Sequence, residues 1–325
     1  MNVRQYQQLI EEAFAEYTRS LPAQPANLYE PIRYTLSLGG KRMRPLLTLM
    51  GAGLFSDDVR NALPAAKAIE LFHNFTLLHD DIMDQAPLRR GQPSVHVKWN
   101  TSIAILSGDV MYTEAFRQLA LGPKTLMPEV LGIFTKTALE VCEGQQYDVD
   151  FESQPDVKIS DYMEMIRLKT AVLLAASLQI GALCGNAAAE EAKRLYDFGV
   201  HVGIAFQLQD DILDVFADSE KFGKTTGGDI VSNKKTYLLL KAFELANRYQ
   251  KEELQHWLLL PASQAKEKVE GVKALYDQLG VRSAAEAEME NQYSTGISAL
   301  EKVNADPARK IVLREFAGQL MVRSH

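Results

Sequence analysis

Apolar residues recur at helical spacing along almost the whole chain, and this periodicity limits the possible folds more than any other feature of the sequence. Near the N-terminus they form one stripe that ends at Leu21 and Pro22: Tyr6, Leu9, Ile10, Ala13, Phe14 and Tyr17. The same spacing predicts further helices over residues 62–84, 103–121, 128–150, 158–185, 188–217, 234–248, 265–279, 282–303 and 306–323. No convincing run of alternating β-branched residues predicts a strand. We therefore expect an all-α protein.

One continuous domain is predicted for residues 1–325. The chain has no Pro- or Ser-rich linker and no low-complexity segment, and 46% of its residues are hydrophobic, enough to bury a large core. The most apolar stretch, residues 171–185, contains Ser177 and Gln179 and is shorter than the roughly 20 apolar residues that cross a bilayer. We expect a buried helix here and no membrane span.

Charge and cysteine content exclude other classes of protein. Asp and Glu number 42 against 35 Lys and Arg, a formal charge of −7, whereas a nucleic-acid-binding domain would be strongly basic. Cys142 and Cys184 each lie in an apolar run, so we expect two buried thiols and no disulfide. Residues 1–17 lack the basic start and apolar core of a signal peptide. These features are typical of a cytoplasmic protein.

Asp80, Asp81 and Asp84 form a carboxylate cluster in one predicted helix. Asp80 and Asp84 are one turn apart and project from the same face, about 6 Å apart, whereas Asp81 points about 100° away. Two like charges at this spacing repel, and a divalent cation resolves the repulsion. Mg²⁺ prefers oxygen ligands and commonly combines one or two carboxylates with substrate phosphates and water. The cluster therefore indicates a magnesium site for an anionic ligand.

The same Asp-Asp-x-x-Asp pattern, with an apolar pair in its middle, recurs at Asp210, Asp211 and Asp214. Gln207 lies one turn before Asp210, on much the same helix face. A single copy of the pattern is often an ordinary solvated helix surface. Both copies are embedded in apolar helix, however, and burying six carboxylates there without cations would be very costly. Two copies therefore favour a metal site over a surface.

Basic residues stand near both clusters, where a diphosphate would need them. They are Lys41 and Arg44 at a glycine-led turn into a helix, Arg89 and Arg90 after the first cluster, Lys169 with Thr170 in an apolar helix, and Lys224 and Lys234 around a glycine-rich loop. Free backbone amides at the start of the helix that contains Arg44 also favour an anion. Each of these residues taken alone would be an ordinary surface charge.

Together these residues resemble the trans-polyprenyl diphosphate synthase family. Seven elements follow in the family's order: Gly-Gly-Lys-x-x-Arg-Pro at 39–45, the first aspartate motif at 80–84, Arg-Arg-Gly at 89–91, Lys-Thr at 169–170, the second motif at 210–214 with Gln207, Gly-Lys at 223–224, and Gly-Gly-Asp-Ile followed by Asn-Lys at 227–234. The match covers nearly the whole chain, and the combination is highly specific.

The resemblance implies an all-α isoprenoid synthase fold, with helices surrounding a deep central cavity, and a homodimer. It implies three Mg²⁺ ions, held with the allylic diphosphate by Asp80, Asp84 and Asp210. The positions that match the family's allylic-diphosphate contacts are Arg89, Lys169, Thr170, Gln207, Lys224 and Lys234. Those that match its isopentenyl-diphosphate site are Lys41, Arg44, His73 and Arg90.

The implied reaction condenses isopentenyl diphosphate with an allylic diphosphate: dimethylallyl, geranyl or farnesyl diphosphate. The allylic diphosphate ionises, the double bond of isopentenyl diphosphate attacks the cation, and the released pyrophosphate removes a proton. Metals and basic residues stabilise the departing diphosphate. The implied catalytic residues are Lys169 and the six motif aspartates, Asp80, Asp81, Asp84, Asp210, Asp211 and Asp214.

Product length is implied by the residues just before the first motif. Phe75, Thr76 and Phe72 are the fifth, fourth and eighth residues before Asp80. Phe75 therefore lies about 7.5 Å and Phe72 about 12 Å down the helix axis. In the family, small residues at these positions suggest a long-chain product and two adjacent aromatics suggest C15. One phenylalanine followed by threonine most resembles a C20 enzyme, with C15 next.

Other classes of protein fit less well. A non-catalytic subunit of a heteromeric synthase would usually lose motif aspartates, and a class I terpene cyclase generally has a different second metal motif. A di-iron bundle could use the Glu-x-x-His pairs at 70–73 and 253–256, but both aspartate clusters would then be unexplained. A phosphate-loop NTPase needs a glycine five residues before Gly223, where this chain has Asp218. Chain elongation remains the favoured interpretation.

Overall fold

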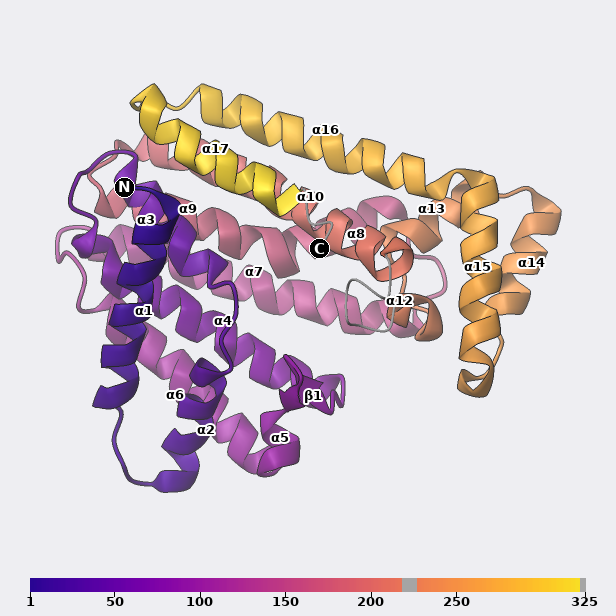
Figure 1. The fold of residues 1–325 in the computed structure, drawn as a ribbon, viewed down its shortest axis with the longest axis horizontal. Helices are drawn as coiled ribbons and strands as arrows, with labels where there is room; N and C mark the ends of the chain where they lie inside the picture. Colours follow the sequence, from indigo (N-terminus) through magenta and orange to yellow (C-terminus); the bar gives the residue numbers. More distant parts are fainter. Residues whose placement is uncertain (218–226, 322–325) are drawn as a thin grey trace. The chain divides into compact units, whose positions relative to one another are not determined.

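The computed structural model describes residues 1–217 and 227–321, and their regular structure is almost all helical (Figure 1). The helices are α1 (Val3–Ser20), α2 (Ala26–Ser37), α3 (Met43–Gly53), α4 (Leu63–Met83), α5 (Val95–Lys98), α6 (Thr101–Leu119), α7 (Met127–Ser153), α8 (Ile159–Ile166), α9 (Val172–Cys184), α10 (Ala189–Phe216), α12 (Gly228–Val231), α13 (Tyr237–Leu245), α14 (Arg248–Leu258), α15 (Ala265–Leu279), α16 (Val281–Glu301) and α17 (Pro307–Met321). A π-helical turn (Arg167–Ala171), two 3₁₀ turns (Arg60–Ala62 and Ala262–Gln264) and a hairpin of β1 (Leu88–Arg89) and β2 (Gln92–Pro93) complete them. The all-α prediction is confirmed.

Every helix predicted from apolar spacing is present, with ends that differ by a few residues. The N-terminal stripe is confirmed, since Tyr6, Ile10, Phe14 and Tyr17 are the buried side chains of α1. Helix α14 was not predicted. Within α14, all of which is described, only Leu254 is buried, so the sequence there carries no apolar stripe. Helix α2 was not predicted either, although it buries Pro31, Ile32, Thr35 and Leu36, so apolar spacing finds most but not all of the helices that bury a face.

The chain divides into two compact units. The first comprises Met1–Thr135, Ala176–Tyr196 and Val303–Leu313. The second comprises Lys136–Ala175, Asp197–Lys302 and Arg314–His325, of which residues 218–226 and 322–325 lie outside the described ranges. Helices α7, α9, α10 and α17 contribute residues to both units.

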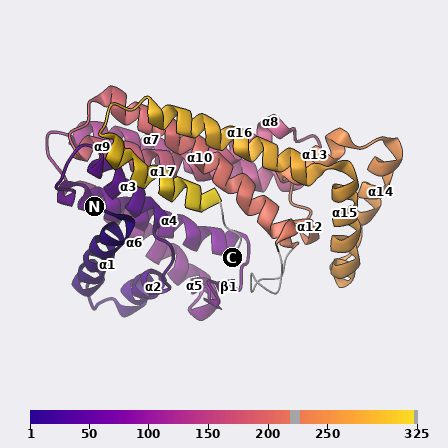
Figure 2. The same cartoon turned by 45° about the horizontal axis from the view of Figure 1, so that its top comes forward.

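The first unit is built around α4, which packs along α6 (Figures 1 and 2). Aromatic side chains meet between the two helices, since Phe72 and Phe75 on α4 both contact Tyr112 on α6. Helix α3 approaches the C-terminal half of α9 so closely that a Cβ at Gly181 would overlap the carbonyl oxygen of Thr48. Glycine at this position therefore sets how closely the two helices pack.

In the second unit, helices α8, α10, α13, α15 and α16 enclose one apolar core. Its fully buried members include Leu208, Ala242, Leu254, Val272 and Val281. Helices α14 and α15 lie side by side in both views (Figures 1 and 2). Leu254 and Val272 bring α14 and α15 into this core.

The most apolar part of the chain lies in a helix that is longer than the apolar stretch alone. Residues 159–184 form a continuous rod of α8, the π turn and α9, and these 26 residues are long and apolar enough to cross a bilayer. The apolar stretch at 171–185 is only the C-terminal part of this helix, so the length of the stretch does not by itself exclude a membrane span. Within the structure, 78% of its most apolar window is buried, as expected for a core helix. The prediction of a buried helix is confirmed, although the reasoning from length was wrong.

The prediction of no strand fails in one place, the hairpin of β1 and β2. Leu88 pairs with Pro93 and Arg89 with Gln92. Arg90 and Gly91, between the strands, have φ values of +54° and +76°. Positive φ at both central residues is the mark of the tight hairpin turn that matches strand twist. Two residues per strand are too few for alternation to be visible in a sequence.

The cysteine prediction is half right. Cys184 is buried, but Cys142 is exposed, and neither forms a disulfide. Val141, the neighbour of Cys142 on α7, is buried. One residue along a helix is a rotation of about 100°, which turns Cys142 outward.

Candidate active site

The first aspartate motif lies at the C-terminal end of α4. Asp80 is partly buried, and Asp84, which follows the last helical residue, is exposed. Asp81 is only 4% exposed. The structure therefore separates the three carboxylates as their helical spacing predicts, with Asp80 and Asp84 accessible and Asp81 turned into the protein.

Asp81 holds an arginine from the hairpin. Arg89 Nε lies 3.0 Å and 3.2 Å from the two carboxylate oxygens of Asp81, and Nη2 of the same guanidinium also donates to it. Ser94 closes the base of the hairpin, its hydroxyl donating to the carbonyl of Ala86 at 2.6 Å. A two-pronged arginine–carboxylate pair is both strong and directional. Asp81 therefore fixes the position of Arg89.

The hairpin turn carries Arg90 to the glycine-led turn before α3. Its Nη1 donates to the carbonyl oxygen of Gly39. A Cβ at Gly40 would lie 2.6 Å from the guanidinium carbon and would displace Arg90, and the φ of +124° at this position also favours glycine. Lys41 follows at the same turn and is exposed. The structure thus brings Lys41 and Arg90 to one turn, as the resemblance implied.

Arg44 and His73 also meet in the first unit. Arg44 Nη1 lies 3.0 Å from His73 Nε2. Desolvation and the charges of Arg44, Arg90 and Arg89 hold the pKa of His73 well below its ordinary value, so its ring is neutral. Because an arginine can only donate, Nε2 is the acceptor. That nitrogen is then not available to a metal, which argues against the di-iron interpretation.

This corner of the first unit suits an anion. Desolvation lowers the pKa of Arg44 to about 10, although the charge of Glu70 opposes the shift. Burial raises the pKa of Glu70, whose carboxylate accepts from Asn74 Nδ2 at 3.2 Å. Among the described residues, the buried Nε of Arg44 has no acceptor. A buried, unsatisfied donor on a cation is a place where an anionic ligand can bind.

The candidate chain-length residues lie against an aromatic cluster. The ring of Phe75 stacks on Tyr112 of α6 at 5.0 Å and contacts His79 at 4.6 Å. Phe72 is 1% exposed and lies 5.7 Å from Phe75. Thr76 donates its hydroxyl to the carbonyl of His73 at 2.8 Å. Tyr112, which stacks on Phe75 from the neighbouring helix α6, was not predicted from the sequence.

The second motif lies at the end of α10, in the second unit. Asp210 and Asp214 are partly buried, and Asp211 is 4% exposed. The Tyr162 hydroxyl donates to Asp211, and Gln207 Nε2 donates to it at 3.1 Å. Burial, and next the charge of Asp229, raises the pKa of Asp211 to about 7, although both hydrogen bonds oppose the shift.

A short polar chain leads from Asp211 to the π turn. Thr170 Oγ1 donates to Gln207 Oε1 at 3.1 Å, and Gln207 Nε2 in turn donates to Asp211 Oδ1. Thr170 and Lys169 both lie in the π turn. Such turns are often found at functional sites. The predicted contacts Lys169, Thr170 and Gln207 are therefore brought together within one unit.

Asp214 holds the start of α12. Its Oδ2 accepts from the amide of Asp229 at 3.0 Å, and its carbonyl accepts from Gly227, whose φ is +87°. Burial, and then the charge of Asp214, raises the pKa of Asp229 to about 6. Asp229 belongs to the Gly-Gly-Asp-Ile element at 227–230, for which the resemblance implied no separate role.

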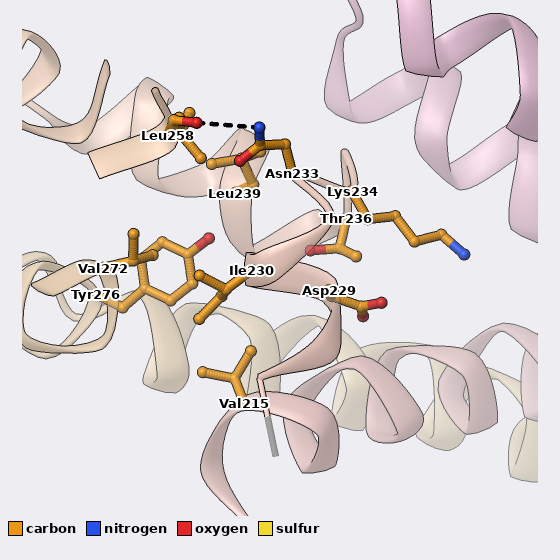
Figure 3. Close-up of a pocket in the computed structure, with 10 residues that line it drawn as sticks. All are labelled: Val215, Asp229, Ile230, Asn233, Lys234, Thr236, Leu239, Leu258, Val272 and Tyr276. Carbon is orange, nitrogen blue, oxygen red and sulfur yellow. Dashed lines mark hydrogen bonds between the residues drawn. The ribbon is translucent and has the colours of Figure 1, made fainter. Parts of the chain in front are cut away.

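Figure 3 shows how α12 is anchored. Ile230 points toward Val215, Val272 and Tyr276, while the side chains of Asp229 and Lys234 extend the other way (Figure 3). Asn233 donates to the carbonyl of Leu258 at 3.1 Å (Figure 3). Apolar packing of Ile230 therefore fixes α12, and the charged side chains of Asp229 and Lys234 lie on its opposite side.

The lysines of the second unit share a carboxylate. Lys169 Nζ donates to Asp148 Oδ2 at 2.6 Å, and Lys234 Nζ lies 3.5 Å from the same oxygen. Asp148, on α7, was not predicted, because nothing in a single helical segment marks it. The predicted contact Lys224 lies outside the described residues.

The donor set of each unit fits magnesium and diphosphate chemistry. Asp80 and Asp84 in the first unit, and Asp210 and Asp214 in the second, offer the hard oxygen ligands that Mg²⁺ prefers. Within residues 1–217 and 227–321, no three His, Cys, Asp or Glu side chains form a complete metal cage. Carboxylates beside arginines and lysines instead suit a metal whose remaining ligands come from a phosphate.

The chain resembles known enzymes along its whole length. The polyprenyl synthetase family model matches residues 25–279. A geranylgeranyl diphosphate synthase of Methanosarcina mazei is 45% identical over 222 residues, 68% of each chain. A short chain isoprenyl diphosphate synthase of Methanothermobacter thermautotrophicus is 35% identical over 99% of this chain and 98% of its own.

Solved structures of the same class of enzyme are also similar to this chain. The crystal structure of geranylgeranyl pyrophosphate synthetase from Pyrococcus horikoshii Ot3 aligns with a TM-score of 0.91 at 36% identity, and covers 99% of this chain and 97% of its own. This likeness confirms the isoprenoid synthase fold. The deep central cavity expected with that fold stays a prediction. The chain therefore belongs to the polyprenyl synthetase family, the trans-polyprenyl diphosphate synthases, and is a prenyltransferase.

Proposed function

We propose that this enzyme condenses isopentenyl diphosphate with an allylic diphosphate by ionisation, condensation and elimination, and that it makes a C20 product, with C15 next. One observation carries the proposal: each Asp-Asp-x-x-Asp motif lies beside basic side chains fixed by their own contacts. Arg89 is held by Asp81 in the first unit, and Lys169 by Asp148 in the second. Relatives named geranylgeranyl diphosphate synthase support the C20 product.

The allylic diphosphate is proposed to bind Arg89 and a set of further cationic and polar groups. Those groups are Lys169, Thr170, Gln207 and Lys234, and Lys224 from outside the described residues. Their donors are placed before substrate arrives, since Lys169 and Gln207 are already hydrogen-bonded. Preorganised donors stabilise the negative charge that grows on the diphosphate as the carbon–oxygen bond breaks.

Asp80, Asp84 and Asp210 are proposed to hold Mg²⁺, three ions in each active site. When bound, the metal neutralises charge on the diphosphate and makes it a better leaving group. Asp81 and Asp211 play a different part, because both are buried and occupied by Arg89 and by Tyr162 with Gln207. Their contribution is to orient the neighbouring groups.

Isopentenyl diphosphate is proposed to bind at the turn before α3, among Lys41, Arg44, His73 and Arg90. The unsatisfied Nε of Arg44 and the neutral ring of His73 support this placement. Helix α3 begins at Met43, so its first amides also face this corner. The proposed base is the pyrophosphate released in the first step.

Three wider proposals follow from the family. The whole chain, residues 1–325, is proposed to act as a single polyprenyl synthetase domain, which the helices shared by the two units support. A cytoplasmic location is supported by two unbonded cysteines. A homodimer is supported by exposed apolar side chains in the first unit, on α6 and the start of α7: Ile105, Leu106 and Leu131. Light scattering of the purified protein measures the oligomeric state.

The function is tested by incubating the protein with isopentenyl diphosphate, Mg²⁺ and each allylic primer in turn, and measuring products by mass spectrometry. A C20 diphosphate is expected. A cyclised hydrocarbon would instead identify a terpene cyclase, and no turnover with any primer would indicate a non-catalytic subunit.

Phe75→Ala tests product length. Removing the ring that stacks on Tyr112 opens space beneath the first motif, so longer prenyl products are expected at similar total turnover. Phe116→Ala is the matched control, because Phe116 contacts Tyr112 from α6 itself and should leave the product unchanged. An unchanged product from Phe75→Ala would move the chain-length determinant elsewhere, with Phe72 the next candidate.

A further inference from the structure

Asp148 lies between two lysines from separate segments of the second unit. Its Oδ2 contacts Lys169 Nζ at 2.6 Å and Lys234 Nζ at 3.5 Å. Asp148 is on α7, Lys169 in the π turn, and Lys234 in the loop between α12 and α13. The carboxylate side chain is 16% exposed, against 24% and 44% for the two lysine side chains. The carboxylate is thus the inner member of the trio.

The backbone is shaped so that Asp148 reaches Lys169. Gly144 lies one turn before Asp148, on the same face of α7. A Cβ at Gly144 would lie 2.8 Å from Lys169 Cα and closer still to its amide nitrogen. With any residue other than glycine at position 144, α7 could not approach the π turn this closely. This close approach brings the carboxylate, one turn along, within hydrogen-bond reach of the lysine.

The charge of Asp148 is maintained by its two partners. Burial raises the pKa of its carboxyl, but the ammonium groups of Lys234 and Lys169 together outweigh burial and hold that pKa below its ordinary value. The carboxylate is therefore ionised. Without it, two ammonium groups would stand near one another in a partly buried place and would repel.

We propose that Asp148 is a positioning residue of the allylic-diphosphate site, which holds the ammonium groups of Lys169 and Lys234 side by side so that both meet one diphosphate. The proposal rests on the function proposed above. It adds a residue that contacts the lysines and not the substrate. The trio keeps a net charge of +1, which still attracts an anion.

Positioning and simple attraction predict different kinetics. An ordinary exposed ion pair is worth little and would leave the rate unchanged. Removing the carboxylate also raises the local charge to +2, which favours binding of a diphosphate in the ground state. The loss should therefore appear in the chemical step, where fixed donors must stabilise developing charge.

The test is Asp148→Asn, which keeps the size of the side chain and removes its charge. We expect kcat to fall at least about tenfold, with KM for the allylic diphosphate within about threefold of the wild type. Asp148→Glu, which restores the charge one methylene further out, should recover part of kcat. Circular dichroism should show unchanged helicity in both variants.

Asp150→Asn is the matched control. Asp150 lies on the same helix, is exposed, and accepts a hydrogen bond from Gln146 at 2.7 Å. Its loss should leave kcat and KM unchanged. A second test combines Asp148→Asn with Lys234→Gln. If Asp148 acts through the lysines, the second substitution should cost less in the double variant than alone.

The outcomes separate the two proposals. If the wild type turns over no primer, the proposed function is wrong and the positioning role falls with it. If the wild type is active but Asp148→Asn keeps kcat within threefold, only the positioning role is wrong. Strictly multiplicative losses in the double variant would also overturn it, and this holds even if Asp148→Asn loses some stability.

Discussion

The two aspartate motifs share one sequence pattern, but their buried middle carboxylates are satisfied in opposite ways. Asp81 in the first unit is held by a cation, the guanidinium of Arg89. Asp211 in the second unit is held by two neutral donors, the Tyr162 hydroxyl and the Gln207 amide. Each is 4% exposed. Equal spacing along a helix therefore does not mean an equal electrostatic role.

The charges around the two motifs differ in the same way as the partners of their middle aspartates. Near the first motif, desolvation and three arginines lower the pKa of His73. Near the second, burial and neighbouring carboxylates raise the pKa of Asp211 to about 7 and that of Asp229 to about 6. The corner around His73 has an excess of positive charge that suits a diphosphate, whereas the buried carboxylates of Asp211 and Asp229 gain from nearby cations.

The largest expected effect is on turnover. Asp80→Asn and Asp210→Asn should each reduce kcat by at least about 1,000-fold, because each removes a proposed metal ligand. Helicity by circular dichroism should stay unchanged. The exposed carboxylate of Asp277 on α15 offers a control, and Asp277→Asn should retain full activity. Wild-type turnover in either motif variant would remove that motif from the metal site and break the comparison.

The next effect is on stability and differs between the middle aspartates. Asp81→Asn leaves Arg89 without its partner and should lower the free energy of unfolding by about 2–3 kcal/mol. Asp211→Asn should cost less than about 1 kcal/mol at pH 8 without metal, because the wild-type carboxylate is ionised there in a buried site with neutral donors. Urea denaturation measures both.

The sign for Asp211 follows from its raised pKa. Between its ordinary value of 3.8 and about 7, the folded protein keeps a proton that the unfolded chain releases. Stability from this group is therefore present at acid pH and is lost as the pH rises through 7. Asp211→Asn should gain on the wild type between pH 5 and pH 8. Equal losses for Asp81→Asn and Asp211→Asn at pH 8 would show that the two sites are alike.

The helices and the motif spacing could be predicted because both are local. An apolar stripe buries a face wherever its helix packs, and Asp80 and Asp84 share a face in any α-helix. The partners could not be predicted in this way. Arg89 lies eight residues after Asp81, beyond the end of α4 and on a two-residue strand, where helical spacing carries no information.

Asp148 shows why the rest of the site was missed. Its partners are 21 and 86 residues away in the chain, and contact depends on the close approach at Gly144. No local pattern marks a carboxylate that pairs only in the folded state. Cys142 was misjudged for a related reason, since its apolar neighbours do not reveal which side of α7 faces solvent.

The smallest expected effect tests the positive charge of the first region. The pKa of His73 lies well below its ordinary value of 6.5, so the unfolded chain binds a proton there as the pH falls below 6.5 and the folded protein does not. Stability is therefore present above pH 6.5 and is lost below it. Relative to His73→Gln, the wild type should lose about 1 kcal/mol of unfolding free energy between pH 7 and about pH 5.7, without substrate.

The groups facing His73 sharpen this expectation. Arg44, Arg89 and Arg90 all oppose a proton on the ring, and Glu70 interacts with Arg44 and Arg90. His201→Gln is the control, because His201 lies in the second unit and bonds to Gln292 at 2.8 Å. A pH-independent difference between the wild type and His73→Gln would mean that the arginines do not govern this corner. The contrast between the two motifs would then rest on Asp211 alone, and Arg44 would be a structural cation instead of an anchor for isopentenyl diphosphate.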